Sequence, residues 1–434
     1  MNGIERREDV QVDGPSRLEE LQEQFPEIPR SIVVKADVLR EGVRYTPELT
    51  TIGKWALPQI HFIFEWDHDD MHRQEDVVDG WITVPQLFCL PDGTNVLIKL
   101  DSDSPYDIRY HGDGRYDLYR DDRVVERISF TPRPQWFTKR TQDGALMCKV
   151  AGGNGECVFS VLNVSFCQYF SEDQQCRFCT IVPTQDRNRE LGMGKLSARS
   201  RERIIETFNT AAAEGSIQHF CLSGGGMFDR SQEASYFIDL VTTLRQAEGY
   251  QGQPFLIASQ ALDPQDARRL HEAGEGTIQI GYPLEVWDEK LFPVVCPGKA
   301  SHVGRTRWLD NMCRAVEIFG RGNVGTNLVA GVETAVPDRF AHEEQALQST
   351  LEGFEWLCRH DIRPAFSPWT VAPGSAWEDK ETPGTHYSLS LGWELYNLQK
   401  KYKLTYDVGL EAGCYKCGVY TIPRDFPRLI DGVE

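Results

Sequence analysis

Beyond residue 150 the sequence alternates six times between a short apolar run and a longer segment with helical periodicity. The expected strands are Val158–Val164, Ile217–Leu222, Phe255–Ala258, Thr277–Ile280, Val324–Val329 and Pro364–Trp369. The expected helices are Ala198–Glu214, Ala234–Glu248, Pro264–Ala273, Thr306–Phe319, His342–Arg359 and Tyr387–Tyr402. Successive β–α units of this kind require a parallel sheet with its helices outside. The pattern predicts an α/β fold, and we favour a partial (β/α)6 TIM-like barrel over an open doubly wound sheet.

The rest of the chain divides by composition. Residues 1–30 form a polar lead-in with a short helix expected at Leu18–Phe25. Residues 31–150 carry β-rich runs from SIVVKADVL to RVVERISF, separated by turn signals such as PDGT, and predict a mostly-β N-terminal domain. The barrel is expected over residues 151–403. Residues 404–434 form a short C-terminal extension that contains a C-x2-C pair.

Charge and composition exclude several classes of function. The chain has 46 basic and 65 acidic residues, a net charge of −19, so a nucleic-acid partner is not expected. No apolar run is long enough to span a membrane, and the N-terminus has no apolar stretch of a secretory signal, so we expect a cytoplasmic protein. In a reducing compartment, the 12 cysteines indicate metal binding or redox chemistry rather than disulfides.

Three of these cysteines follow the first expected barrel strand directly. Cys167, Cys176 and Cys179 have the spacing C-x8-C-x2-C, and Phe178 precedes the last of them. Barrel active sites are built from loops at this end of the strands. Three thiolates suit zinc or an iron–sulfur cluster. A structural zinc site takes four protein ligands, whereas three cysteines leave one iron of a [4Fe–4S] cluster open.

This combination resembles the radical SAM superfamily, whose members carry three cysteines after the first strand of a partial (β/α)6 barrel. The Cys176-Arg177-Phe178-Cys179 end matches the family, while the first gap is longer than the commonest C-x3-C-x2-C spacing. The resemblance covers roughly residues 156–400 and places the chain in no named subfamily. It implies that a reduced [4Fe–4S] cluster cleaves S-adenosylmethionine (SAM), and that the resulting 5′-deoxyadenosyl radical abstracts a hydrogen atom from the substrate.

The same resemblance implies a set of SAM-binding residues. Ser223, Gly224, Gly225 and Gly226 stand where the family has a Gly-Gly-Glu motif, so the backbone would hold the methionyl amino group. The other implied contacts are Phe178 beside the open iron, Glu285 past the fourth strand, Arg305 and Arg307 at a helix start, and Asn327 in the fifth strand. Each of these is equally compatible with an ordinary strand-end or helix-start role.

A second metal site is expected in the C-terminal extension. Cys414 and Cys417 offer two ligands, which is too few for a site, and Cys296 in a glycine-flanked loop is the favoured partner, with Cys148 and Cys157 as the alternative. An auxiliary iron–sulfur cluster, a zinc ion and two free thiols all remain open. For His61, His68 and His72 a solvated acidic turn is favoured over a metal site.

Two classes of function follow. The first is a radical SAM enzyme that acts on a small molecule or peptide in a biosynthetic pathway. The second is a noncatalytic zinc- or iron–sulfur-binding structural protein. For the enzyme, flavodoxin or ferredoxin is the expected electron donor, because six basic residues accompany three acidic ones in Asp186–Arg203, and acidic donors would be attracted there. These basic residues are Arg187, Arg189, Lys195, Arg199, Arg201 and Arg203. A solvated helix face is the alternative.

Overall fold

The centre of the protein is a six-stranded parallel sheet. The computed structural model describes residues 16–58, 77–78, 81–82, 84–153, 155, 157–164, 166–190, 200–215 and 217–433. The sheet consists of β8 (Val158–Val164), β9 (His219–Gly224), β10 (Phe255–Ala258), β11 (Ile278–Gly281), β12 (Val324–Ala330) and β13 (Arg363–Pro368). Its strands lie side by side in chain order, without the reversal of a doubly wound sheet. The expected α/β class and all six expected strands are confirmed.

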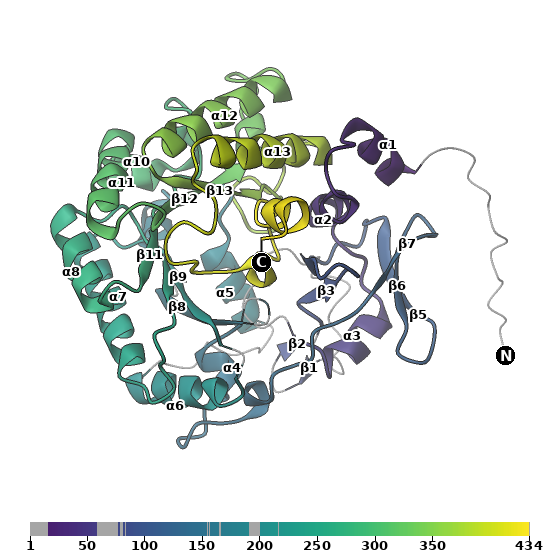
Figure 1. Ribbon diagram of the computed structural model, residues 1–434, viewed down its shortest axis with the longest axis horizontal. Coiled ribbons are helices and arrows are strands. Elements are labelled where there is room, and N and C mark those ends of the chain that lie inside the picture. The colour runs from purple at the N-terminus through teal and green to yellow at the C-terminus, as the bar shows by residue number, and fades with distance from the viewer. Residues whose placement is uncertain are drawn as a thin grey trace.

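Helices cover the outer side of this sheet (Figure 1). They are α6 (Arg201–Ala212), α7 (Arg230–Arg245), α8 (Pro264–Gly274), α11 (Arg305–Phe319), α12 (Glu343–Arg359) and α13 (Thr385–Lys401). Shorter helices lie in the connections, namely α5 (Ile181–Glu190), α9 (Phe292–Val295) and α10 (Pro297–His302). Each βαβ unit thus returns to the next parallel strand through an outer helix.

Residues on the inner side of the sheet alternate with period two. Cys221 of β9 pairs in register with Ser160 of β8 and with Leu256 of β10, and all three line an interior cavity. The two residues that flank Cys221 along β9, Phe220 and Leu222, point to the other face of the sheet and are buried against the helices. This alternation follows from strand geometry and creates a chamber inside the curve of the sheet.

The N-terminal part contains short strands and more helix than expected. Its strands are β1 (Val77–Val78), β2 (Trp81–Ile82), β3 (Leu87–Cys89), β4 (Asn95–Leu97), β5 (Tyr106–Tyr110), β6 (Tyr116–Arg120) and β7 (Arg123–Ile128). Its helices are α1 (Arg17–Gln24), α2 (Arg30–Glu41), α3 (Pro47–Gly53) and α4 (Met147–Val150). α1 confirms the expected short helix, whereas the expectation of a strand in SIVVKADVL was wrong, because this run lies within α2.

The physical reason for this error is the burial of α2. Every residue from Ile32 to Leu39 is buried, because the helix packs between α13 and β4. A helix that is buried on all sides has no polar face, so its valines and isoleucine suggest a strand. The hydrophobic core of the N-terminal part is continuous with that of the sheet and its helices.

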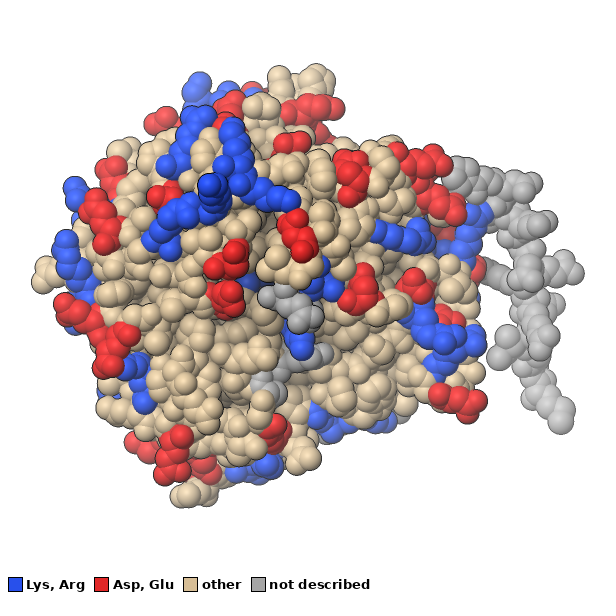
Figure 2. Space-filling view, in the orientation of Figure 1, with Lys and Arg blue, Asp and Glu red and all other residues tan. Residues whose placement is uncertain are grey.

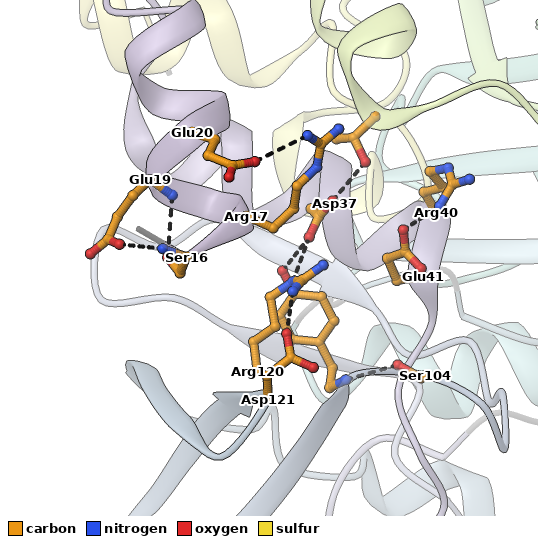
Figure 3. Close-up of polar contacts among 12 residues, drawn as sticks. Ser16, Arg17, Glu19, Glu20, Asp37, Arg40, Glu41, Ser104, Arg120 and Asp121 are labelled. Atoms are coloured by element: carbon orange, nitrogen blue, oxygen red, sulfur yellow. Dashed lines mark hydrogen bonds and ion pairs between the residues drawn. The ribbon is translucent and has the colours of Figure 1, made fainter. Parts of the chain in front are cut away.

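The buried Asp37 links four elements (Figure 3). Its carboxylate accepts hydrogen bonds from the Tyr106 hydroxyl of β5 at 2.6 Å and from Arg120 Nε of β6 at 3.1 Å. It also accepts one from the Thr385 hydroxyl of α13 at 2.6 Å. These charge-assisted bonds compensate the burial of the carboxylate and fix α2 against both parts of the molecule.

The C-terminal segment, residues 404–433, returns across the inner side of the sheet and ends near the centre of the view in Figure 1. On the face shown in Figure 2, charges of both signs lie mostly toward the periphery and leave a broad central area with few charged side chains. Among the helices described, none is both long enough and apolar enough to cross a bilayer.

Candidate metal centres and interior cavity

The cysteine loop begins at the carboxyl end of β8. Cys167 precedes the 3₁₀ turn Gln168–Glu172, and a turn in which Cys179 N–H donates to Cys176 C=O at 2.9 Å closes the loop before α5. Burial raises the pKa of Cys179, and so do the nearby thiols of Cys176 and Cys167. The three sulfurs therefore face a common region.

The glycine run at the end of β9 packs directly under this loop. A Cβ on Gly225 would overlap the carbonyl oxygen of Phe166 and lie 2.7 Å from Cys167 Cβ, so only glycine fits there. The Gly226 carbonyl accepts a hydrogen bond from Gln168 N–H at 2.9 Å. The run thus brings two backbones together beside the first cysteine.

A buried carboxylate holds the glycine run in place. Glu233 of α7 accepts hydrogen bonds from Met227 N–H and Gln260 N–H, each at 2.9 Å. Gln260 in turn donates from its side-chain amide to Met227 C=O at 2.6 Å and accepts from the Tyr169 hydroxyl. Glu233 could not be recognised from the sequence, because a glutamate inside a helix carries no sign of the loop that it will contact.

Cys296 lies against the cysteine loop and not near the C-terminal pair. Arg177 N–H donates to Val295 C=O at 2.9 Å, which brings the two loops together. A hydrogen bond from the Cys296 thiol lowers the pKa of Cys176, while burial raises the pKa of Cys296. The favoured grouping of Cys296 with Cys414 and Cys417 is therefore replaced, because the α9–α10 turn directs this thiol toward Cys176.

A buried lysine beside these thiols is a second residue that the sequence did not reveal. Lys299 Nζ donates to Glu285 Oε1 at 2.7 Å and to Pro283 C=O at 2.6 Å. Burial alone would lower its pKa, but the charges of Glu285 and Cys176 outweigh burial and raise it, so the side chain is a cation. Its only sequence signal is the short Cys-Pro-Gly-Lys turn.

Glu285 is held by the sheet in a conformation that L-residues rarely adopt. Its φ is 72°, its N–H donates to Asn327 C=O at 3.0 Å, and its C=O accepts from Val329 N–H at 2.8 Å. Strained backbone of this kind persists where the surrounding structure imposes it, and such positions cluster at functional sites. Here the Glu285 carboxylate accepts the hydrogen bond from Lys299 Nζ.

The other residues implied to bind SAM lie in different surroundings. Ser223 and Asn327 line the interior cavity, and Phe178 packs against the hydrophobic core. The two arginines have other partners. Arg305 donates to Trp287 C=O at 2.8 Å, and Arg307 pairs with Asp263 at 2.9 Å. Their expected pairing with the SAM carboxylate stays a prediction that would require both to leave these partners.

A second group of ligands lies at the opposite end of the same strands. Cys157 directly precedes β8, His219 begins β9, and Cys414 and Cys417 come from the C-terminal segment. The Sγ atoms lie 3.1 Å apart for Cys157 and Cys414, 3.2 Å for Cys157 and Cys417, and 3.3 Å for Cys414 and Cys417. His219 Nε2 lies 2.9 Å from Cys417 Sγ. Because β8 has seven residues, this group stands about 20 Å from the cysteine loop.

Protons are unevenly shared in this group. Burial lowers the pKa of His219 to about 4, so its imidazole is neutral. Hydrogen bonds from Cys157 and Cys417 lower the pKa of Cys414 to about 2. The hydrogen bond to Cys414 raises the pKa of Cys157 to about 12, and burial raises that of Cys417. Three cysteine sulfurs and an imidazole form a soft donor set.

An interior cavity of about 550 Å³ extends along the inner side of the sheet between these two ends. Cys414 and Cys417 line its amino end, and Ser223 and Asn327 line it toward the carboxyl ends of the strands. Two buried polar atoms on cavity-lining side chains, Gln279 Oε1 and Arg363 Nε, have no hydrogen-bond partner. Both atoms are fully buried, so other parts of these two side chains face the cavity.

Several sequence-based expectations fall outside the described residues. These are the side chains of His61, His68, His72, Arg187, Arg189, Lys195 and Arg199. Of the expected basic patch, Arg201 is paired with Asp239, and Arg203 Nε lies 2.7 Å from Asp143.

Comparisons with known proteins give distant structural likenesses, of which two are described here. No family model and no curated protein matches the sequence. The crystal structure of a methylornithine synthase is similar over 60% of this chain and 72% of its own, at 13% identity and a TM-score of 0.39. A radical SAM methyltransferase from Sphaerobacter thermophilus is similar over 68% of this chain and 76% of its own, also at 13% identity and a TM-score of 0.39. Values this low do not assign the chain to a family.

Proposed function

We propose that this protein is a radical SAM enzyme with a partial (β/α)6 barrel, and that Cys167, Cys176 and Cys179 bind its [4Fe–4S] cluster. The observation that carries the proposal is the joint position of the three thiols. They come from one loop at the carboxyl end of the first parallel strand, beside a buried cation and against a backbone that only glycine permits. When bound, the cluster would supply the electron that cleaves SAM and starts radical chemistry on the substrate.

The residues of the chain would perform the tasks of binding and exclusion. Lys299 would offset part of the negative charge of the cluster and its thiolates, since it is buried next to Cys176. Gly225 would allow the end of β9 to lie against Cys167, and Glu233 would hold that backbone in position. Buried surroundings strengthen such electrostatic interactions, because solvent screening is weak there.

The interior cavity is the proposed substrate site. Its volume of about 550 Å³ lies within the range of small-molecule pockets. A small molecule or the side chain of a peptide would fit in this space, and the mostly apolar wall would exclude water from the radical.

The proposal is tested by iron and sulfide analysis of anaerobically reconstituted protein. The wild-type chain should hold about four irons and four sulfides in a [4Fe–4S] cluster. The Cys167→Ala, Cys176→Ala, Cys179→Ala triple variant should lose them. Cys313→Ala, a matched change of a half-buried thiol in α11, should keep them. Equal iron in wild type and triple variant would contradict the assignment.

The alternative of a noncatalytic metal-binding protein makes a different prediction. It requires metal in the cysteine loop but no SAM cleavage upon reduction. The interior cavity of about 550 Å³ favours the enzyme, because small-molecule sites are pockets of this size.

A further inference from the structure

Four metal-ligating side chains meet at the amino end of β8 and β9, where the proposed radical chemistry requires none. Cys157, His219 and Cys417 are buried, with 3%, 3% and 9% of their surface exposed, and Cys414 is half-buried. Their four ligand atoms all lie within 4.8 Å of one another. Such a concentration of thiols and an imidazole is unusual unless the side chains bind the same metal ion.

The spacing of the ligands suits a single ion. At a Zn–S bond length of about 2.3 Å, tetrahedral geometry separates the sulfurs by about 3.8 Å. The three observed Sγ–Sγ distances of 3.1–3.3 Å are shorter than this value by about half an ångström, so small side-chain movements would bring the sulfurs to tetrahedral positions. A cluster of four irons would separate its cysteine ligands more widely. One histidine with three cysteines is also a standard ligand set of structural zinc.

The backbone around Cys414 and Cys417 forms a compact turn. Cys417 N–H donates to Cys414 C=O at 3.1 Å, and the preceding Gly413 has a φ of 93°. This turn leaves both sulfurs on one side, as the C-x2-C pairs of zinc sites require.

The turn packs against the segment just before β8, which contains the first ligand, Cys157. A Cβ on Gly155 would overlap the carbonyl oxygen of Lys416, so glycine is needed for the two segments to meet. Asn95 Nδ2 from the N-terminal part donates to the same carbonyl at 3.1 Å. Two distant parts of the chain therefore meet the turn through residues other than cysteine.

The local charges are appropriate for a zinc ion with three thiolates. Such a centre carries a net charge of −1, since three thiolates exceed the charge of the ion by one. Lys416 lies near Cys157, and Arg424 lies near His219 and donates to the Gly413 carbonyl. These two cations would compensate the remaining negative charge.

We propose that Cys157, His219, Cys414 and Cys417 bind one structural zinc ion that fixes the C-terminal segment to the amino end of β8 and β9. Binding releases the protons of the thiols to solvent and involves no change of oxidation state. The ion would join residues that are 257 and 260 positions apart in the chain.

The site would also define one end of the interior cavity. Cys414, Cys417, Tyr420, Thr421 and Arg424 all line it, so the zinc-bound segment would form its floor. The Thr421 hydroxyl donates to Phe366 C=O of β13, which attaches the segment to the far edge of the sheet. A metal at the turn thus holds the floor at one side, and this hydrogen bond holds it at the other.

The test uses full-length protein with Cys167, Cys176 and Cys179 replaced by Ala, so that the result does not depend on the proposed radical chemistry. Metal analysis should find about one zinc per chain and no acid-labile sulfide. Adding Cys414→Ser and Cys417→Ser, or Cys157→Ser, should lower zinc to less than about a tenth of an equivalent. Adding Cys313→Ala should leave it unchanged. Iron with sulfide at this site would overturn the proposal, as would a disulfide without metal.

A second measurement covers the case in which the site variants do not fold. Cobalt(II) exchanged into the same full-length background should give the visible absorption of a tetrahedral ion and the near-ultraviolet thiolate charge-transfer bands of three cysteines. Limited proteolysis after removal of the metal by a chelator should then cut the C-terminal segment faster than in the metal-bound protein. An octahedral cobalt spectrum, or cleavage at an unchanged rate, would contradict a zinc site at this position.

Discussion

Gly225 and Phe166 touch so closely that no side chain fits between the backbone of one and the carbonyl of the other. Phe166 directly precedes the first cysteine of the C-x8-C-x2-C loop, and Gly225 lies in the run that ends β9. The contact couples the two motifs that define the proposed SAM site.

Gly225→Ala should therefore disrupt the cysteine loop. The added Cβ meets backbone atoms that cannot rotate away, so we expect most of the iron and sulfide to be lost after reconstitution. Gly226→Ala is the graded comparison, because its Cβ would meet the side chains of Gln260 and Tyr169 at 3.1 Å and these have some freedom to move. Equal iron content in wild type and Gly225→Ala would show that the contact is not required.

Lys299 should raise the reduction potential of the proposed cluster. Lys299→Gln removes a buried cation beside Cys176, so the potential measured by a redox titration with EPR detection should become more negative by on the order of tens of millivolts. Lys299→Arg should keep most of the wild-type potential, since the charge remains. The exposed Lys290→Gln is the control. A purely structural lysine would change the stability of the protein and leave the potential unaltered.

The buried ion pair of Lys35 and Asp425 should dominate the attachment of α2 to the C-terminal segment. Lys35 Nζ lies 2.7 Å from Asp425 Oδ2 and also 2.7 Å from Gly418 C=O. Lys35→Met should cost about 3–5 kcal/mol in denaturant unfolding, because it leaves a buried carboxylate without its main partner. Combining it with Asp425→Leu should recover much of this loss. The exposed Lys401→Ala should have little effect on the unfolding free energy; an equally small effect of Lys35→Met would refute the account.

Glu333 should make stability fall as the pH rises. Burial raises the pKa of Glu333 to about 7, so the folded protein retains a proton that the unfolded chain loses from about pH 4.5 upward. The stabilisation that this proton contributes to the folded protein is therefore lost progressively between about pH 4.5 and 7. Glu333→Gln mimics that form and keeps partners at Thr350 and Gly331. Its advantage over wild type in unfolding free energy should grow by roughly 2.5 kcal/mol from pH 5 to pH 8.

The parallel sheet could be predicted from sequence because each strand is a short apolar run between helical periods. Val158–Val164 and Phe255–Ala258 match the observed strands at both ends, and the other four strands differ by one or two residues at one or both ends. α2 could not be predicted, because a helix enclosed on all sides loses the polar periodicity that identifies a helix.

The candidate sites divide in the same way. The cysteine loop is local, so its spacing is visible in the sequence. The second metal group combines Cys157 with His219 and two cysteines more than 190 positions further on, and only the return of the C-terminal segment brings them together. Lys299 likewise acquires its place through folding. Cys296 was misassigned to the second group because spacing gives no direction for a single thiol.

Reductive cleavage of SAM tests the central claim most directly. Anaerobically reconstituted protein with dithionite and SAM should produce 5′-deoxyadenosine and methionine, and the triple variant of Cys167, Cys176 and Cys179 should produce neither. Cys414→Ser with Cys417→Ser should retain the proposed cluster at the opposite end of the strands. A wild-type protein that holds a [4Fe–4S] cluster, accepts an electron and leaves SAM intact would contradict the account.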